Sequence, residues 1–487
     1  MKVFISGHKF NYEIEKLCRI FLPFEKFEFI EENKAESDIG VILDKGNEYN
    51  MTAFLKLLGK ECVKEKTVSP TSDKECEREL AVLLYSCFCE LTGYESKWGI
   101  LTGVRPAKLY SSLQRAGGTD AADKYFLENL LVSTKKLELA QACNKGEAAI
   151  TSLSQEKSFS LYIGIPFCPS RCSYCSFVSH SVEQAKKLIP EYVEYLCREI
   201  EYTGKIAKDL DLRLETIYIG GGTPTSLSAE QLTKIMESVK KNFNLNFLRE
   251  YTVEAGRPDT VTYDKLLAIK EGGADRVSIN PQTMNDDVLK TIGRKHTVKQ
   301  TEEALALAKE VGFKNINMDL IAGLPTDSLE SFKNTVDRVV DMDPESITVH
   351  TLCLKRSASL NSGDLSWLKD GDTAANMVDY AKEKLGEAKY YPYYMYRQSK
   401  MVGNLENVGY SKEGYEGLYN VYIMDETHSI LACGATAVTK LRRYNDTAIE
   451  RIYNFKYPYE YINRFDEQMT RKERIYSFYG EQPNKDK

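Results

Sequence analysis

Six short apolar runs recur along the middle of the chain, and segments with helical periodicity lie between them. Each run combines β-branched, aliphatic or aromatic residues over five to nine positions, as buried strands do. The runs are 160–167, 216–221, 250–256, 276–280, 316–324 and 346–352. The helical segments are 190–202, 228–243, 263–273 and 298–313. This alternation predicts an α/β fold with a parallel sheet and right-handed crossovers.

Six repeats are too few for the eightfold barrel. The pattern therefore predicts either a partial (β/α)6 barrel or a doubly wound sheet, over residues 156–385. In both folds the active site lies at the C-terminal ends of the strands. We therefore expect the catalytic and cofactor-binding residues at that edge of the sheet.

The segments on either side have a different pattern. Residues 1–155 contain short mixed elements and a long helical section from about Cys76, which predicts an α+β domain of unknown role. Residues 386–487 are rich in tyrosine and glycine, and predict an α+β cap with strands near 392–397 and 419–424. We expect the last residues, GEQPNKDK, to be disordered.

Composition narrows the class of protein. The 487 residues are 42% hydrophobic and 28% charged, which is typical of a globular protein. The net charge of −6 gives no support to a nucleic-acid partner. No apolar run approaches the ~20 residues of a membrane span, and the start lacks the apolar region of a signal peptide. We expect a cytoplasmic protein without a membrane span.

Three of the twelve cysteines lie close together. Cys168, Cys172 and Cys175 follow the first strand with C-x3-C-x2-C spacing. Three thiolates so spaced can ligate three irons of a [4Fe–4S] cubane, which leaves the fourth iron open. The amino and carboxylate groups of S-adenosylmethionine (SAM) could chelate that iron, and reductive cleavage would then give a 5′-deoxyadenosyl radical.

Three other interpretations of these cysteines remain. A structural zinc site needs a fourth ligand, for which His180 or Cys197 would serve. A redox pair of cysteines and a chance grouping of core cysteines are the others. The strand-end position favours the cluster over all three.

A glycine-rich turn, GGGTPT (220–225), ends the second strand. Glycines let the backbone approach a ligand closely, and bare N–H and C=O groups can bind an amino or carboxylate group. A tight turn between strand and helix would have the same composition. The nearby cysteines favour binding of the methionine moiety.

Several motifs together carry a family resemblance. LYIGIPFCPSRCSYCSF, GGGTPT, VEAGRPDT, RVSINPQTMNDDVLKTIGRKHT and NINMDLIAGLPTD resemble the oxygen-independent coproporphyrinogen III oxidases of the radical SAM superfamily. WGILTGVRPAKLY and YRQSKMVGNLENVGYS resemble, more narrowly, the HemZ branch. The resemblance covers essentially the whole chain.

The resemblance implies roles for individual residues. Cys168, Cys172 and Cys175 would hold the cluster, and Tyr162, Glu254 and Arg294 would lie at the catalytic centre. The residues expected to bind SAM or an adjoining second cofactor are Tyr162, Gly221, Gly222, Thr223, Glu254, Gln282, Arg294 and Asp319. Each of three residues also has an ordinary alternative role. Glu254 could be a solvated strand-end carboxylate, Arg294 a charge at a helix terminus, and Asp319 a cap of the following helix.

Two positions depart from the HemN oxidases. Phe177 stands where those enzymes carry a further cysteine, and Gly164 stands where they carry a histidine in the strand before the cluster. The related haem-chaperone branch, HemW, also has phenylalanine at the first position. The three cluster ligands are intact.

The leading hypothesis is an oxidative decarboxylation of coproporphyrinogen III to protoporphyrinogen IX without oxygen. Basic groups near the mouth would pair with propionates; the candidates are Arg171, Arg294, Lys355 and Arg356. His296 and His350 are further candidates near that mouth. A flavodoxin or ferredoxin would supply electrons. The alternatives are a haem chaperone of HemW type and a haem-modifying radical SAM methyltransferase or ring-opening enzyme.

Overall fold

The computed structural model describes residues 1–69, 72–353, 366–444, 446 and 448–480. The chain forms two compact units. The first comprises Met1–Asn144, Thr351–Asp379 and Met395–Asn407, and the second comprises Lys145–His350, Tyr380–Tyr394 and Val408–Lys487. Every helix in the described ranges is too short or too polar to span a lipid bilayer. The predicted boundaries at 155 and 385 stay a prediction.

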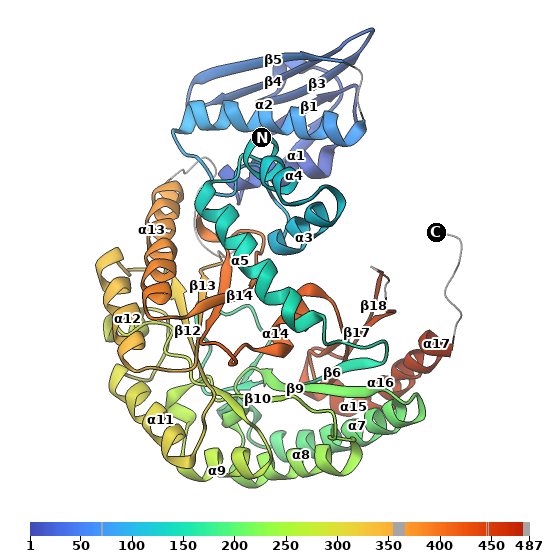
Figure 1. The fold of residues 1–487 in the computed structure, drawn as a ribbon, viewed down its shortest axis with the longest axis vertical. Coiled ribbons are helices and arrows are strands. Elements are labelled where there is room, and N and C mark those ends of the chain that lie inside the picture. Colours follow the sequence, from blue (N-terminus) through green and yellow to red (C-terminus); the bar gives the residue numbers. More distant parts are fainter. Residues whose placement is uncertain (70–71, 354–365, 445, 447, 481–487) are drawn as a thin grey trace. The chain divides into compact units, whose positions relative to one another are not determined.

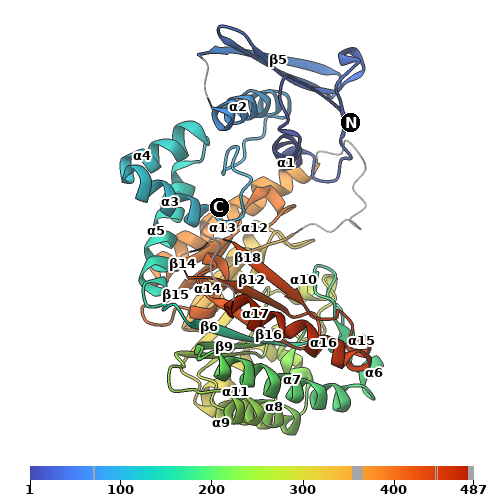
Figure 2. The same ribbon diagram turned by 90° about the vertical axis from the view of Figure 1, so that its right-hand side faces the viewer.

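The first unit begins with a five-stranded sheet of order β2-β1-β3-β4-β5. Helices α1 and α2 lie along one face of it (Figures 1 and 2). A capping box between Ser72 and Glu75 starts α2, and Gly93 ends it in the left-handed conformation. The elements are β1 (Lys2–Ser6), α1 (Asn11–Phe21), β2 (Glu28–Ile30), β3 (Ile39–Lys45), β4 (Tyr49–Leu57), β5 (Lys60–Val68) and α2 (Asp73–Thr92). The predicted helix from Cys76 is confirmed.

The remainder of the first unit brings together two segments with HemZ-like motifs. The indole N–H of Trp98 donates to Glu406 at 2.7 Å, and the guanidinium of Arg397 donates to the carbonyl of Leu101 at 2.8 Å. Lys136 and Glu406, both buried, form an ion pair at 2.6 Å. Helices α3 (Pro106–Gly117) and α4 (Thr119–Lys124) precede α5 (Thr134–Thr151). These motifs therefore serve packing within this unit.

The second unit contains the predicted parallel strands. All six are present and lie in chain order: β6 (Ser158–Ile165), β9 (Arg213–Gly221), β10 (Glu250–Glu254), β11 (Arg276–Ser278), β12 (Ile316–Ala322) and β13 (Ser346–Thr351). The short strands β7 (Phe167–Cys168) and β8 (His180–Ser181) pair separately. The prediction of a partial (β/α)6 barrel, α/β in class, is confirmed.

Helices cover the outer face of these strands and form an arc around them (Figure 1). They are α7 (Ile189–Asp209), α8 (Ala229–Asn242), α9 (Tyr263–Glu271), α11 (Val298–Val311) and α12 (Leu329–Asp341), with α6 (Val182–Ala185) and α10 (Asp286–Thr291) in connections. Outward residues such as Ile163, Ile219 and Val253 are buried beneath them. Because side chains alternate along a strand, the inner face carries Tyr162, Tyr218 and a polar set that includes Asn317.

The C-terminal region extends the sheet at both ends. β16 (Ser429–Cys433) pairs parallel to β6, and β15 (Asn407–Ser411) pairs antiparallel to β13. The other elements are α13 (Ser366–Glu387), β14 (Tyr391–Tyr396), β17 (Val438–Arg442), β18 (Ile449–Tyr453), α15 (Pro458–Asn463), α16 (Phe465–Lys472) and α17 (Arg474–Gly480). The strand predicted near 392–397 is confirmed, and residues 481–487 lie outside the described residues.

The strand predicted over 419–424 is wrong, because that segment is the helix α14 (Leu418–Asp425). Its sequence has apolar and aromatic residues that suit a strand, but its first backbone N–H groups have a partner elsewhere in the chain. The Glu250 carboxylate accepts from the N–H of Leu418 at 2.6 Å and from that of Tyr419 at 3.1 Å. A carboxylate at a helix N-terminus stabilises the helix, and this contact is invisible in the local sequence.

Candidate active site at the strand ends

The three clustered cysteines lie on one loop directly after β6. Cys168 ends the short strand β7, which pairs with β8. The N–H of Ser173 donates to the carbonyl of Ile292 at 3.0 Å, and the N–H of Cys175 donates to that of Cys172 at 3.3 Å. The loop therefore lies at the predicted C-terminal edge of the sheet and is fastened to the turn after α10.

The glycine turn after β9 lies against this loop. Gly221 has a φ of +111°, which a side chain would strain. A Cβ atom at Gly222 would lie 2.6 Å from the carbonyl oxygen of Phe167 and 3.0 Å from Cys168 Sγ. The hydroxyl of Thr223 lies 3.6 Å from the same sulfur. Position 222 therefore needs glycine partly because the cysteine loop packs against it.

Two buried arginines hold the loop from the other side. Arg257 Nη1 lies 3.7 Å from Cys172 Sγ and 3.2 Å from Ser170 Oγ. Arg294 donates to the Tyr174 hydroxyl at 3.1 Å and to the backbone carbonyls of Gly256 and Asn280. The structure thus shows Arg294 supporting the backbone, and its expected contact with a cofactor stays a prediction.

Glu254 ends β10 on the inner face. The Tyr218 hydroxyl donates to Glu254 Oε1 at 2.5 Å. Burial raises the pKa of Glu254 to about 7, while the hydrogen bond from Tyr218 opposes that shift. A carboxyl group poised near neutrality at the mouth of a barrel is typical of a functional site.

Three tyrosine rings stack behind Glu254. The ring centroids of Tyr218 and Tyr419 are 4.6 Å apart, and that of Tyr162 is 6.3 Å from each, with interplanar angles of 16° to 23°. Tyr419 comes from α14, so this helix places an aromatic ring beside the inner-face tyrosines. The Tyr162 hydroxyl lies near Gly221, and the expected contact of Tyr162 with SAM stays a prediction.

Asp319 and His350 face one another across β12 and β13. Their closest atoms, Oδ2 and Nε2, are 3.7 Å apart, and Asn317 donates to Asp319 at 2.7 Å. Burial alone would raise the pKa of Asp319, but hydrogen bonds and charge from His350 outweigh it, so the pKa is lowered. The carboxylate is therefore ionised beside a half-buried imidazole, and the predicted strand-end position of His350 is confirmed.

Gln282 combines backbone strain with an unused polar group. Its φ is +69°, in the left-handed region, and its side chain is 5% exposed. Its Oε1 is buried with no hydrogen-bond partner among the described residues. An orphaned buried carbonyl is costly unless a ligand satisfies it, so the expectation that Gln282 binds a cofactor has physical support.

His296 differs from Gln282, although both lie near the cysteine loop. It is buried beside Asp259, with Nδ1 4.0 Å from Oδ1. Burial, followed by the charge of Arg294, lowers its pKa to about 3. A neutral, enclosed imidazole does not suit contact with an anionic ligand.

The donor set fits a cubane cluster. A mononuclear site needs ligands that converge on one point. A cubane instead bonds each thiolate to a different iron. Three thiols on one loop match that requirement.

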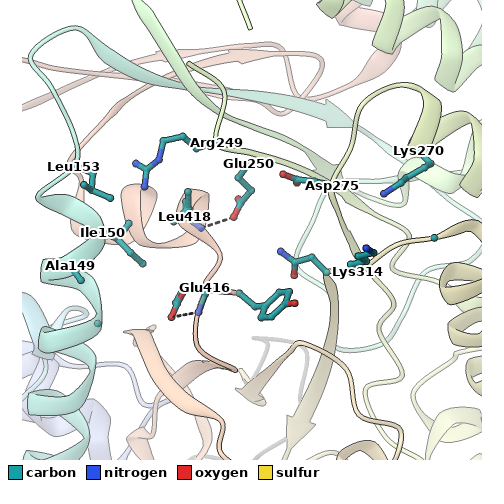
Figure 3. Close-up of a pocket in the computed structure, with 15 residues that line it drawn as sticks. Ala149, Ile150, Leu153, Arg249, Glu250, Lys270, Asp275, Lys314, Glu416 and Leu418 are labelled. Carbon is teal, nitrogen blue, oxygen red and sulfur yellow. Dashed lines mark hydrogen bonds between the residues drawn. The ribbon is translucent and has the colours of Figure 1, made fainter. Parts of the chain in front are cut away.

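A cavity of about 850 Å³ lies at the opposite ends of the strands. Arg249, Glu250 and Asp275 line it at the starts of β10 and β11, and Lys314 lines it before β12 (Figure 3). Active sites of such folds lie at the other edge. The cavity therefore lies outside the candidate active site.

Sequence reasoning missed Arg257, Tyr174 and Tyr218. Tyr218 could have been found, because alternation places it on the same face as Tyr162 in the next strand. Arg257 lay inside a motif used only for Glu254. Tyr419 comes from α14, which was predicted as a strand.

The comparisons with known proteins agree with this geometry. Residues 162–339 match the radical SAM superfamily. The chain is 34% identical, over 96% of each chain, to the oxygen-independent coproporphyrinogen-III oxidase-like protein HemZ of Bacillus subtilis. It is 39% identical over 197 residues, 40% of this chain and 51% of the relative, to the haem chaperone HemW of the same organism.

Among solved structures, coproporphyrinogen III oxidase HemN from Escherichia coli shares the fold. The TM-score is 0.51 at 22% identity, over 66% of this chain and 72% of HemN. A [4Fe–4S] cluster and SAM are the cofactors of the superfamily, and hence of this chain. The chain belongs to the HemZ branch of the oxygen-independent coproporphyrinogen III oxidase family, within the radical SAM superfamily.

Proposed function

We propose that Cys168, Cys172 and Cys175 ligate three irons of the cluster and leave the fourth for SAM. The single observation that carries this proposal is the strand-end loop that bears the three thiols, where Cys168 lies against Gly222 and Cys172 lies against Arg257. When bound, the cluster and SAM supply a 5′-deoxyadenosyl radical by reductive cleavage of a C–S bond.

The residues around the loop would bind and orient SAM. The N–H groups of Gly222 and Thr223 donate to the carbonyls of Ile165 and Phe167, both at 2.8 Å, so this turn would contribute close backbone approach beside Cys168 and not free N–H donors. Glu254 would accept from an ammonium or hydroxyl group. Gln282 Oε1, which has no partner in the described part of the chain, would accept another N–H or O–H. Tyr162 would contact the cofactor with its ring, and Asp319 and Arg294 would complete the polar wall.

We propose that the substrate is a tetrapyrrole, and that coproporphyrinogen III is decarboxylated oxidatively to protoporphyrinogen IX. Similarity to HemZ across the whole chain supports this class of substrate. Arg171, exposed on the cysteine loop, is the propionate-binding candidate. Lys355 and Arg356 lie outside the described residues. A flavodoxin or ferredoxin in the cytoplasm would supply electrons.

A second candidate function is haem delivery, as the name of the HemW relatives states for those proteins. The observation that favours it is Phe177, which stands in the loop with its side chain 54% exposed. An exposed aromatic ring beside the cluster can stack on a flat macrocycle. In this alternative the tetrapyrrole is carried and not converted.

Anaerobic turnover separates the two functions. Reconstituted protein is incubated with coproporphyrinogen III, SAM and a reductant, and vinyl product, carbon dioxide and 5′-deoxyadenosine are measured. The proposal predicts all three, in matched amounts, and their loss in Cys172→Ala. Retention of one haem per chain without vinyl product would support the carrier, and conversion of haem itself would support a haem-modifying enzyme.

A further inference from the structure

Arg257 sits between the cysteine loop and an acidic partner. Its side chain is 4% exposed. Nε donates to Asp259 Oδ1 at 2.9 Å and Nη2 donates to Oδ2 at 2.8 Å. The remaining nitrogen, Nη1, points to Cys172 Sγ at 3.7 Å and to the hydroxyl of Ser170 at 3.2 Å. The fork with Asp259 thus fixes the direction in which Nη1 points.

This arrangement directs the positive charge of Arg257 toward Cys172 Sγ. A paired guanidinium and carboxylate cancel at long range, but the positive end faces the sulfur and the negative end faces away. Cys172 is buried, so solvent screens this dipole little. A surface arginine on the same loop, such as Arg171, would be hydrated and would act weakly.

We propose that Arg257 is a positioning residue that raises the reduction potential of the bound cluster through Cys172. The inference rests on the cluster ligation proposed above. Reduction adds negative charge to the cluster and its thiolates, and hydrogen bonds to those sulfurs are an established way to tune such potentials. A donor and a positive charge directed at Cys172 Sγ therefore favour the reduced state.

Redox titration of the reconstituted protein, followed by electron paramagnetic resonance, tests the inference. Arg257→Gln removes the positive charge, and we expect a shift of about tenfold toward the oxidised form at fixed ambient potential, about 59 mV for one electron. Arg257→Lys keeps the charge and should recover part of that shift. Arg338→Gln, at a partly exposed arginine on α12, is the matched control and should leave the potential unchanged.

Asp259→Asn distinguishes electrostatics from loosening of the loop. It removes the negative end of the pair, so the potential should rise, opposite in sign to Arg257→Gln. A residue that only supports the loop would shift both variants the same way. Shifts of one sign, or an unchanged potential in Arg257→Gln, would overturn the inference. If Arg257→Gln takes up no iron, the sign in Asp259→Asn decides.

Failure of the ligation proposal would look different. In that case the wild-type protein would not take up four irons and four sulfides, whatever residue stands at 257. A wild-type protein with a full cluster, and an Arg257→Gln variant with the same potential, would reject the role of Arg257 alone.

Discussion

Glu250 and Gln282 are buried at opposite ends of the parallel strands, and they differ in their hydrogen bonding. At the strand starts, both oxygens of Glu250 accept backbone N–H groups, and Arg276 donates to the Ser346 hydroxyl and the Tyr415 carbonyl. At the strand ends, Gln282 Oε1 has no partner among the described residues, and burial raises the pKa of Glu254, which accepts from Tyr218, to about 7. Satisfied groups stabilise a fold, whereas unsatisfied ones are available to ligands.

This difference gives a rule for variants. A change at the strand starts should reduce stability and leave cofactor binding intact. A change at the strand ends should reduce cofactor binding and leave stability intact, or increase it. Each prediction below tests one side of that rule.

The largest expected effect is that of Cys172→Ala. Loss of one thiolate should reduce iron and sulfide to background and abolish the ~400 nm absorbance of thiolate-ligated iron. The far-ultraviolet circular dichroism should stay that of a folded chain. Cys197→Ala, on α7, is the control and should keep the absorbance. If Cys197→Ala removed the metal as well, a zinc site with Cys197 as the fourth ligand would become the better interpretation.

Glu254→Gln should change stability in a pH-dependent way in the cofactor-free protein. The pKa of this carboxyl is raised from 4.5 to about 7 in the folded state, so the folded chain holds the proton more tightly than the unfolded chain. Proton binding by Glu254 therefore adds about 3 kcal/mol to the free energy of unfolding below about pH 4.5, and this contribution is lost as the pH rises through 7.

Urea unfolding at pH 5 and pH 8 measures this effect. Glutamine never ionises, so the variant should gain stability over the wild type at pH 8 and gain little at pH 5. SAM binding should weaken about tenfold through a lost hydrogen bond to a charged group. Glu237→Gln, an exposed residue on α8, should show no such pH dependence. Equal stability differences at both pH values would contradict the raised pKa.

Much of the fold, but only part of the site, could be predicted from sequence. The six strands were predictable because each is a local apolar run between helical segments, and the cysteines because their spacing is local. The position of Tyr419 was not predictable, because the helical conformation of residues 418–425 depends on Glu250. This residue lies 168 positions before Leu418 in the chain. Arg257 was hidden because its contact with Cys172 spans 85 positions. Side chains that act through distant partners leave no periodic signal.

Glu250→Ala tests the strand-start side of the comparison. It leaves two backbone N–H groups at the start of α14 without their acceptor, at a cost of about 3 kcal/mol. Urea unfolding should show that loss, while the iron and sulfide content after reconstitution stays at the wild-type level. Glu413→Ala, an exposed acid shortly before α14, is the control. Loss of the cluster in Glu250→Ala, with stability unchanged, would reverse the assignment of the two ends.

The smallest expected effect, from Gln282→Gly, addresses both sides of the comparison in one variant. Glycine adopts the +69° φ of this position without strain, so the cofactor-free protein should gain about 1 kcal/mol. The same change removes the orphaned carbonyl, so SAM should bind a few-fold more weakly. Lys389→Gly, at a φ of +63°, should give the gain in stability without the loss of binding. If Gln282→Gly bound SAM as tightly as the wild type, the strained backbone would be a feature of the turn alone, and an unsatisfied group would no longer mark the ligand side of this unit.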